Sequence, residues 1–457
     1  MNHGTTIVAE LESYLRREHL TISKFAELSG LHSGTLSNII NGQRPISMKQ
    51  LDQMTEGMGL KKGHYYDQYI TDYIINGSAD WRRTGPLLQQ CAELGDLEAI
   101  RRVVNNILDN LTYLPMLFDA AESLFDQGLY SAASIIYKGV AEGERFQHSE
   151  RLALCQYRLF HMQLGEKQDS NLQAANQFEP YVERLDEADQ LDAIKQLADV
   201  YASLHRWDKV EEWAETMERK ATLQYQYPND KTVSPQKPTR PYIYYILYSF
   251  LSRSGVYDER GDYEKALYYA SLYSDIIWVK VPLSATELLV IEQFNEWATI
   301  NKYLYHLMSG QADSLPALVS YLKERENEIF PALFKIMQAA NRFNINVDKV
   351  LTCFISHLSY REQRSRLGNF TRQITEDRYT RFLAELAVYH LRMERYDQGF
   401  DYLSQSFESS RRTQSNDNMM RCVGLFERYR TLASPEQKEK FFTDNFLSYD
   451  FWYWGIK

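Results

Sequence analysis

The clearest candidates for chemistry in this sequence are five short polar residues near the N-terminus. They are His32, Ser33, Thr35, Ser37 and Asn38. Each offers hydrogen-bonding groups, an Asn amide can pair bidentately with adenine, and Ser and Thr hydroxyls adapt to several base edges. Their spacing places them on the exposed side of one short helix over residues 33–40. We therefore expect these side chains to contact base edges of double-stranded DNA.

Short helices joined by tight turns would position these side chains. The spacing of apolar residues predicts helices over residues 7–19, 22–29, 33–40 and 48–58. Thr21 and Ser33 are predicted N-caps, and Gly30 is predicted to end the second helix. Ser47 and Gln50 predict a capping box before the fourth helix. Two short helices joined by a glycine-containing turn are typical of a helix-turn-helix, whose second helix enters the DNA major groove.

More than a dozen positions at fixed spacing within residues 20–60 match one class of helix-turn-helix domain. They include Leu20, Thr21, Phe25, Ala26, Ser29, Gly30, Leu36, Ser37, Ile39, Asn41, Gly42, Arg44, Pro45, Leu51, Gly59 and Leu60. On these residues the segment resembles the Cro/phage-repressor (XRE) class. The resemblance implies phosphate contacts from residues beside the recognition helix, namely Ser23, Lys24, Asn41, Gln43 and Arg44. Ile22 and Ile40 depart from the class, which usually carries Gln and Glu at these two positions.

The charge of the N-terminal segment is too small to hold DNA strongly. Residues 1–62 contain seven Lys and Arg against six Asp and Glu, a net charge of about +1, whereas the whole chain carries -10. Phosphate neutralisation supplies most non-specific affinity for DNA. One copy is therefore expected to bind DNA weakly. We expect a homodimer to reach sufficient affinity by binding two half-sites of an operator. A helix-turn-helix used only for protein contact is the alternative.

Residues 63–457 contain no catalytic signature. The motifs HExxH, GxSxG, GxGxxG and the P-loop are absent, and the ten histidines are dispersed. Cys91, Cys155, Cys353 and Cys422 form no CxxC pair, which excludes a zinc ribbon and disfavours a disulfide framework. We therefore expect no enzymatic activity, no cofactor and no metal.

Composition predicts an all-α protein of the cytoplasm. Gly (21) and Pro (12) are scarce among 457 residues, and apolar residues repeat with helical spacing. No N-terminal signal peptide is recognised. The longest dense apolar run, Tyr242 to Leu251, has ten residues, whereas crossing a bilayer takes about 20. We therefore expect no membrane partner.

A short motif recurs beyond residue 81. In this motif an aromatic residue is followed three positions later by a compact residue. The aromatic residues are Tyr130, Trp207, Tyr263 and Tyr396, and the compact ones are Ala133, Val210, Ala266 and Gly399. This pattern resembles the tetratricopeptide repeat. The resemblance implies roughly six to nine helical hairpins, stacked into a right-handed α-solenoid with a concave face for peptide-like ligands.

The sequence thus predicts three parts. They are a helix-turn-helix domain over 1–62, a connecting helix within 63–80, and a degenerate tetratricopeptide-repeat domain over 81–457 for peptide binding and dimerisation. This layout resembles the RRNPP group of peptide-pheromone receptors. The resemblance implies a cytoplasmic quorum-sensing transcriptional regulator, in which a short signalling peptide bound by the repeats changes DNA binding. The alternatives are an adaptor that sequesters a protein partner, such as a response regulator, and a phosphatase-stimulating protein of the Rap type.

Asparagines on inner helices hold the peptide backbone in that family, because an amide both donates and accepts. The resemblance therefore points to Asn295 and Asn301, and the repeat that ends at Trp207 places Asp192, Lys195 and Asp199 on the concave face. The alternative is that all five are ordinary solvated residues. The aromatic C-terminus, from Phe446 to Trp454, is expected to cap the last hairpin or to form a dimer contact.

Overall fold

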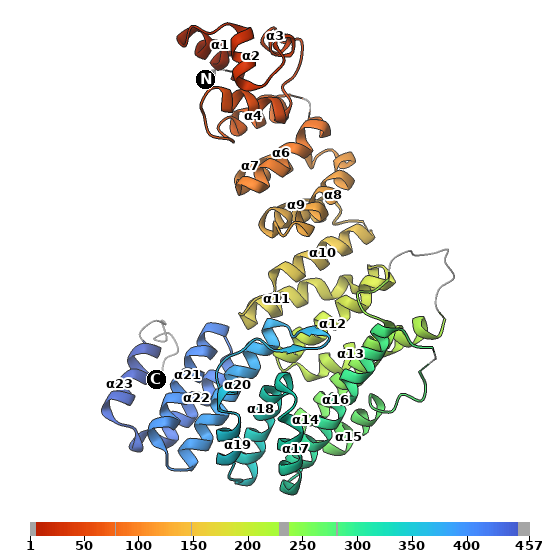
Figure 1. Cartoon of the computed structure of the whole chain (residues 1–457), viewed down its shortest axis with the longest axis vertical. Coiled ribbons are helices and arrows are strands. Elements are labelled where there is room, and N and C mark those ends of the chain that lie inside the picture. Colours follow the sequence, from red (N-terminus) through yellow and green to blue (C-terminus); the bar gives the residue numbers. More distant parts are fainter. Residues whose placement is uncertain (1–5, 78, 148, 228–236, 280–281, 447–457) are drawn as a thin grey trace. The chain divides into compact units, whose positions relative to one another are not determined.

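The computed structural model describes residues 6–77, 79–147, 149–227, 237–279 and 282–446, with side chains as far as residue 441. The described residues are almost entirely helical, which confirms the all-α prediction (Figure 1). Among them the only strands are β1 (Arg364–Ser365) and β2 (Gly368–Asn369), which pair antiparallel with Arg364 opposite Asn369. The aromatic C-terminus, including the side chain of Phe446, lies outside the described residues.

The chain divides into two compact units, Met1–Met162 and Gln163–Lys457. The elements of the first unit are α1 (Ile7–Arg17), α2 (Ile22–Ser29), α3 (Ser33–Ile40), α4 (Met48–Gly57), α5 (Tyr66–Tyr69), η1 (Ile70–Ile75), α6 (Trp81–Leu94), α7 (Leu97–Ile107), η2 (Leu111–Tyr113), α8 (Leu114–Asp126), α9 (Tyr130–Gly143) and α10 (Glu150–Gln163), whose last residue crosses the boundary.

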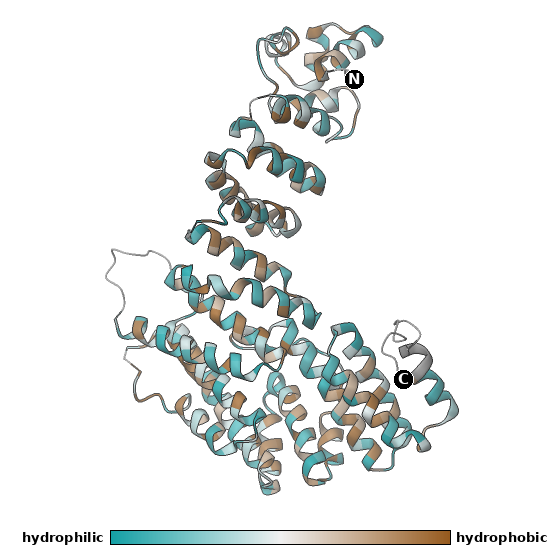
Figure 2. Cartoon of the chain, turned by 180° about the vertical axis from the view of Figure 1, so that it is seen from behind, coloured by the Kyte–Doolittle hydropathy of each residue, from teal (hydrophilic) through white to brown (hydrophobic). Residues whose placement is uncertain are grey.

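The second unit contains the remaining elements. They are α11 (Gln168–Phe178), η3 (Glu179–Arg184), α12 (Glu187–Ser203), α13 (Trp207–Gln226), α14 (Tyr242–Glu259), α15 (Tyr263–Leu272), α16 (Ala285–Met308), η4 (Ala312–Ser314), α17 (Leu315–Leu322), α18 (Glu326–Phe343), α19 (Asp348–Cys353), η5 (Ile355–His357), β1, β2, α20 (Arg372–Arg392), α21 (Tyr396–Thr413), α22 (Asn416–Tyr429), η6 (Arg430–Leu432) and α23 (Pro435–Phe446). Hydrophobic and hydrophilic residues alternate along most of these helices, as expected for helices that bury one face (Figure 2).

The first four helices lie close to their predicted bounds. The Thr21 hydroxyl accepts a hydrogen bond from the Lys24 amide, and the predicted capping box of α4 is present. Gly30 ends α2 with φ +66°, a conformation that favours glycine. The prediction of Ser33 as an N-cap is wrong, because the chain turns one residue earlier. His32 occupies the cap position of α3, and its side chain makes no capping bond.

The predicted connecting helix over residues 64–76 is instead one short α-turn, α5, followed by the π-helix η1. Its tyrosines attach it to the preceding segment. The hydroxyl of Tyr66 donates to Asp52 (2.8 Å), and that of Tyr69 donates to the carbonyl of Ile46 (2.7 Å). The first 62 residues are therefore tied to the chain that follows by buried aromatic side chains.

Each copy of the recurring aromatic motif begins the second helix of a packed helix pair. Tyr130, Trp207, Tyr263 and Tyr396 are the first residues of α9, α13, α15 and α21. The compact position is needed because the helices touch there. Ala133 and Ala266 are fully buried. A Cβ atom added to Gly399 would lie 2.6 Å from the Leu391 Cγ atom.

Five helices of the second unit form a closed ring. In the order α12, α14, α16, α18 and α20, each helix packs against the next, and α20 packs against α12 (Figure 1). The α12–α20 seam is polar. Asp377 lies 3.1 Å from His205 Nε2 and accepts a hydrogen bond from Gln168 at 3.4 Å. A partly open space lies between the helices of this ring.

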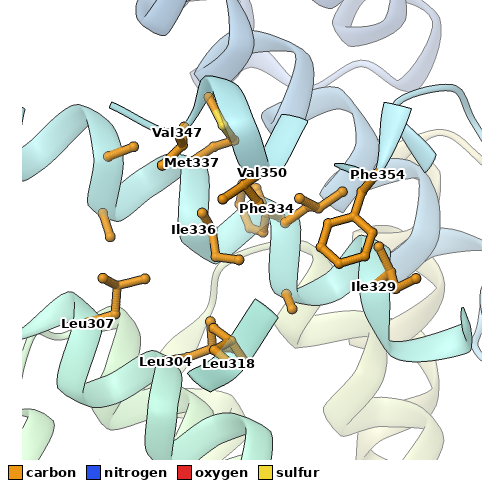
Figure 3. Close-up of a cluster of buried hydrophobic side chains, with 14 of the residues drawn as sticks. Leu304, Leu307, Leu318, Ile329, Phe334, Ile336, Met337, Val347, Val350 and Phe354 are labelled. Carbon is orange, nitrogen blue, oxygen red and sulfur yellow. The ribbon is translucent and has the colours of Figure 1, made fainter. Parts of the chain in front are cut away.

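A hydrophobic core supports the α16–α18 side of this ring. Leu304 of α16, Leu318 of α17, Met337 of α18 and Val350 of α19 belong to one buried cluster (Figure 3). Phe382 of α20 belongs to the same cluster and is fully buried. Burial of this kind stabilises a helix by about 1.5–3 kcal/mol for each large side chain. This core therefore joins α16, α17, α18, α19 and α20, and some of its members, such as Leu304, also line the cavity.

Candidate functional site

The first candidate site is the polar surface around α3 in the first unit. Leu36 and Ile39 bury the opposite side of this helix and are at most 1% exposed. None of the ten residues predicted to contact DNA is buried. Thr35 and Ser37 are half-buried, and the exposed ones are Ser23, Lys24, His32, Ser33, Asn38, Asn41, Gln43 and Arg44. The fold therefore leaves all ten side chains accessible on α2, on α3 and in the turn that follows.

The packing of α2 and α3 against α4 fixes this surface. Gln53 of α4 donates to the Gly30 carbonyl at 3.2 Å, which holds the turn between the two helices. Gly57 at the end of α4 lets the helix approach α2 closely, because an added Cβ atom would lie 2.7 Å from the Ser29 Cβ atom. The angle between α2 and α3 thus depends on residues outside the polar surface.

The positive charge at this surface is small. Lys24 pairs with Glu27 at 2.8 Å, and the hydrogen bond from Lys24 lowers the pKa of the Glu27 carboxyl. Arg44 makes no ion pair with the described part of the chain. An exposed pair of this kind contributes little stability, so a phosphate group can compete for Lys24.

The second candidate site is a cavity of about 280 Å³ inside the helix ring. Its lining comes from α12, α13, α14, α16, α18 and α20, with Phe370 from the loop before α20. Trp207, Trp297 and Phe334 supply flat apolar surfaces. Pockets that bind small organic molecules or peptide segments are of this size, largely apolar, with a few placed polar groups.

Three cationic side chains at the cavity are each engaged by carboxylates. Lys195 lies 2.6 Å from Asp199. Lys335 lies 2.6 Å from Asp258 and 2.7 Å from Glu259. Arg381 lies 3.1 Å from Glu259. These charges are already neutralised within the protein.

The carboxylates of these pairs respond differently to burial. Burial raises the pKa of Asp258 despite Lys335, and its Oδ1 atom has no hydrogen-bond partner within the described residues. Burial also opposes ionisation of Glu259, but Lys335 and Arg381 outweigh it and hold the pKa of that carboxyl well below its usual range. Asp258 Oδ1 is therefore a buried acceptor without a partner among the described residues, on a residue that lines the cavity.

Glu328 is the cavity carboxyl whose charge changes near neutral pH. Burial raises its pKa to about 7. It accepts hydrogen bonds from Trp297 Nε1 at 3.0 Å and from Gln293 Nε2 at 3.2 Å. Gln293 in turn accepts from the Arg366 amide at 3.1 Å, so the β1–β2 hairpin is linked to this carboxyl.

Arg378 is the cavity cation without a close carboxylate. No Asp or Glu of the described chain lies within 4 Å of its guanidinium. Its Nη1 atom donates to the side chain of Gln363, and its guanidinium lies over Phe370 at 5.9 Å from the ring centre. Burial lowers the pKa of Arg378 below its usual range, and the more distant carboxylates of Asp377 and Glu328 oppose this shift only in part.

Two of the five residues predicted to hold a peptide line this cavity. They are Asp199 and Asn301, and Asn301 also donates to the Tyr273 hydroxyl at 2.9 Å. Lys195 lies beside Asp199. Asn295 and Asp192 are not among the lining residues.

Asp192 has a different set of contacts. It accepts hydrogen bonds from the amide and the hydroxyl of Thr239, at 3.0 and 2.6 Å, and from the hydroxyl of Tyr245. These bonds fix the chain that leads into α14. The carboxylate therefore has partners within the protein.

Sequence reasoning missed the charged residues of α18 and α20. Lys335, Arg378 and Arg381 lie outside the four copies of the recurring aromatic motif, so no register pointed to them. A usable signal was the group Asp377, Arg378 and Arg381 on a helix that also carries the mostly apolar run from Phe382 to Leu391, because charges at buried helical positions need a structural or binding partner.

Comparison with known proteins gives no relative. No protein-family model matches the chain, and no curated protein sequence matches it. Within the described residues, no three His, Cys, Asp or Glu side chains are grouped as metal ligands. No described helix is both long and apolar enough to cross a membrane.

Proposed function

We propose that this chain is a cytoplasmic, homodimeric transcriptional regulator of the RRNPP type. Its residues 1–62 bind a double-stranded DNA operator through α3, and residues 63–80 connect them to the repeat-like helices of 81–457. Those helices bind a short signalling peptide, and binding changes the affinity for DNA. The chain acts without catalysis and without a cofactor.

The partly open cavity of the helix ring carries this proposal. It combines flat aromatic walls with acceptors and donors such as Asp258 Oδ1, Asn301 and Arg378. A peptide segment needs both kinds of polar partner for its main chain, together with apolar surface for its side chains. The pair of short helices α2 and α3, with its accessible polar residues, supports the DNA-binding half.

Selection experiments with the full chain test the proposal. A randomised DNA duplex pool is expected to yield a palindromic sequence with two half-sites, as a dimer requires. A randomised hexapeptide pool is expected to yield peptides that bind one per subunit. No enriched duplex together with no enriched peptide would contradict the proposal and favour the adaptor.

A further inference from the structure

We propose that Arg378 receives a carboxylate group of the ligand inside the ring cavity. This inference rests on the proposed peptide binding and specifies the chemistry of the peptide. The carboxylate comes either from the C-terminus of the peptide or from an Asp or Glu side chain, since both present the same group.

The first step is the distribution of charge at the cavity. Lys195, Lys335 and Arg381 each lie within 3.1 Å of a carboxylate of the same unit. Arg378 has no such partner among the described residues, although it lines the same cavity. A buried charge is costly unless it is paired, so an anionic ligand at Arg378 would remove a cost that the empty protein bears.

The second step is the geometry of the guanidinium. Nη1 is occupied by Gln363, while Nε and Nη2 make no hydrogen bond to the described part of the chain. These two nitrogens form one edge, and an edge of this kind binds both oxygens of a carboxylate. Phe370, under the guanidinium, limits the approach to the plane of that edge.

The third step is an unsatisfied donor beside Arg378. Gln363 is 5% exposed, and its Nε2 atom has no hydrogen-bond partner within the described residues. Its Oε1 atom accepts from Arg378, so the orientation of the amide is set. Gln363 is not among the cavity-lining residues, so its contribution is to hold Nη1 of Arg378 and to leave the other edge of the guanidinium for a ligand.

The fourth step concerns the charge of the ligand. Asp199, Asp377 and Glu328 also line the cavity. Their negative charges would repel a phosphate dianion, whereas a single carboxylate balances the one unpaired guanidinium. These carboxylates therefore disfavour a doubly charged group more strongly than a singly charged one.

The test uses two randomised hexapeptide pools and the full chain. One pool has free C-terminal carboxylates and the other has C-terminal amides. Bound peptides are recovered by affinity selection and identified by mass spectrometry. If the C-terminus supplies the group, enrichment is expected only in the free-acid pool. If a side chain supplies it, both pools are expected to yield Asp or Glu at one fixed position.

Variants then locate the contact. Arg378→Gln is expected to weaken binding of the best recovered peptide at least tenfold. Arg378→Lys keeps the charge but loses the paired donors, so its peptide affinity is expected to lie between those of the parent protein and Arg378→Gln. Arg253→Gln is the matched control, because Arg253 pairs with Glu215 and Glu218 and does not line the cavity. Its peptide affinity is expected to be unchanged.

The outcomes separate the two proposals. Recovered peptides that carry no carboxylate, or unchanged affinity in a folded Arg378→Gln variant, would overturn the role of Arg378 and leave peptide binding intact. If Arg378→Gln fails to fold, selection from the two pools with the unaltered chain still shows whether a bound peptide needs a carboxylate. No enrichment in either pool would contradict both the carboxylate contact and the proposed function.

Discussion

Glu328 gives the cavity its own dependence on pH. The unfolded chain loses the Glu328 proton near pH 4.5, whereas the folded chain keeps it to about pH 7. Between these values the folded state holds more protons than the unfolded state, so its stability falls as pH rises. Above about pH 7 the full cost of burying the ionised carboxyl is present.

Glu328→Gln is expected to remove this cost. The amide oxygen can still accept from Trp297 and Gln293, and no charge remains. The variant should be more stable than the parent by about 1–3 kcal/mol at pH 8 and equally stable at pH 4.5. Thermal unfolding of both proteins at the two pH values is the measurement. A gain of equal size at both would show that ionisation is not its cause.

Asn301 and Asn295 were predicted to act alike, but only Asn301 lines the cavity. Asn301→Ala is expected to weaken a recovered peptide by about 1–3 kcal/mol, because a peptide group loses its partner. Asn295→Ala on the same helix is the control, with unchanged affinity. Calorimetry measures both, and an equal loss in the two variants would place the ligand along the whole helix.

Individual contacts were the least predictable feature from the sequence. Helical register correctly separated Leu36 and Ile39 from the exposed residues of α3. It could not show that Thr239, far along the chain, would bind Asp192. Register places a side chain on a face, whereas its partners depend on loops brought in from elsewhere.

At the scale of elements, α3 carries the DNA-binding claim. Thr35→Ala combined with Asn38→Ala should abolish specific binding to the selected operator and leave helicity and oligomeric state unchanged, because neither side chain is buried. Asn105→Ala with Asn106→Ala, two exposed asparagines of α7, is the control. Fluorescence anisotropy with the duplex gives the affinities, and undiminished binding by the α3 variant would refute the assignment.

The contact between α4 and α2 should be sensitive to a single methyl group. Gly57→Ala places a Cβ atom 2.7 Å from that of Ser29 and 3.1 Å from the Phe25 ring. A loss of about 1–3 kcal/mol is expected. Gly424→Ala in α22 meets nothing within 4 Å and should instead be neutral or up to about 1 kcal/mol stabilising. Thermal unfolding compares them, and a stable Gly57→Ala variant would mean that the helices separate easily.

Most elements could be predicted because apolar spacing and caps are local signals. The π-helix η1 could not, since residues 64–76 show one continuous helical pattern. The α12–α20 seam was also missed. Its contacts join His205 and Gln168 to Asp377 across 172 and 209 residues of sequence, separations at which local sequence patterns give no information.

At the scale of the whole molecule, the chain separates into Met1–Met162 and Gln163–Lys457. The polar surface of α3 belongs to the first unit and the ring cavity to the second. A regulator of the proposed kind requires that occupancy of the cavity changes DNA affinity, because a ligand shifts an equilibrium only through different affinities for its two states.

The most direct test measures operator affinity with and without a saturating amount of the recovered hexapeptide. Fluorescence anisotropy of the full chain is expected to show at least a tenfold change in operator affinity, about 1.4 kcal/mol of coupling. In Arg378→Gln, the peptide concentration that produces half of this change should be at least tenfold higher than in the parent protein. Identical DNA affinity with and without a peptide that demonstrably fills the cavity would contradict the account.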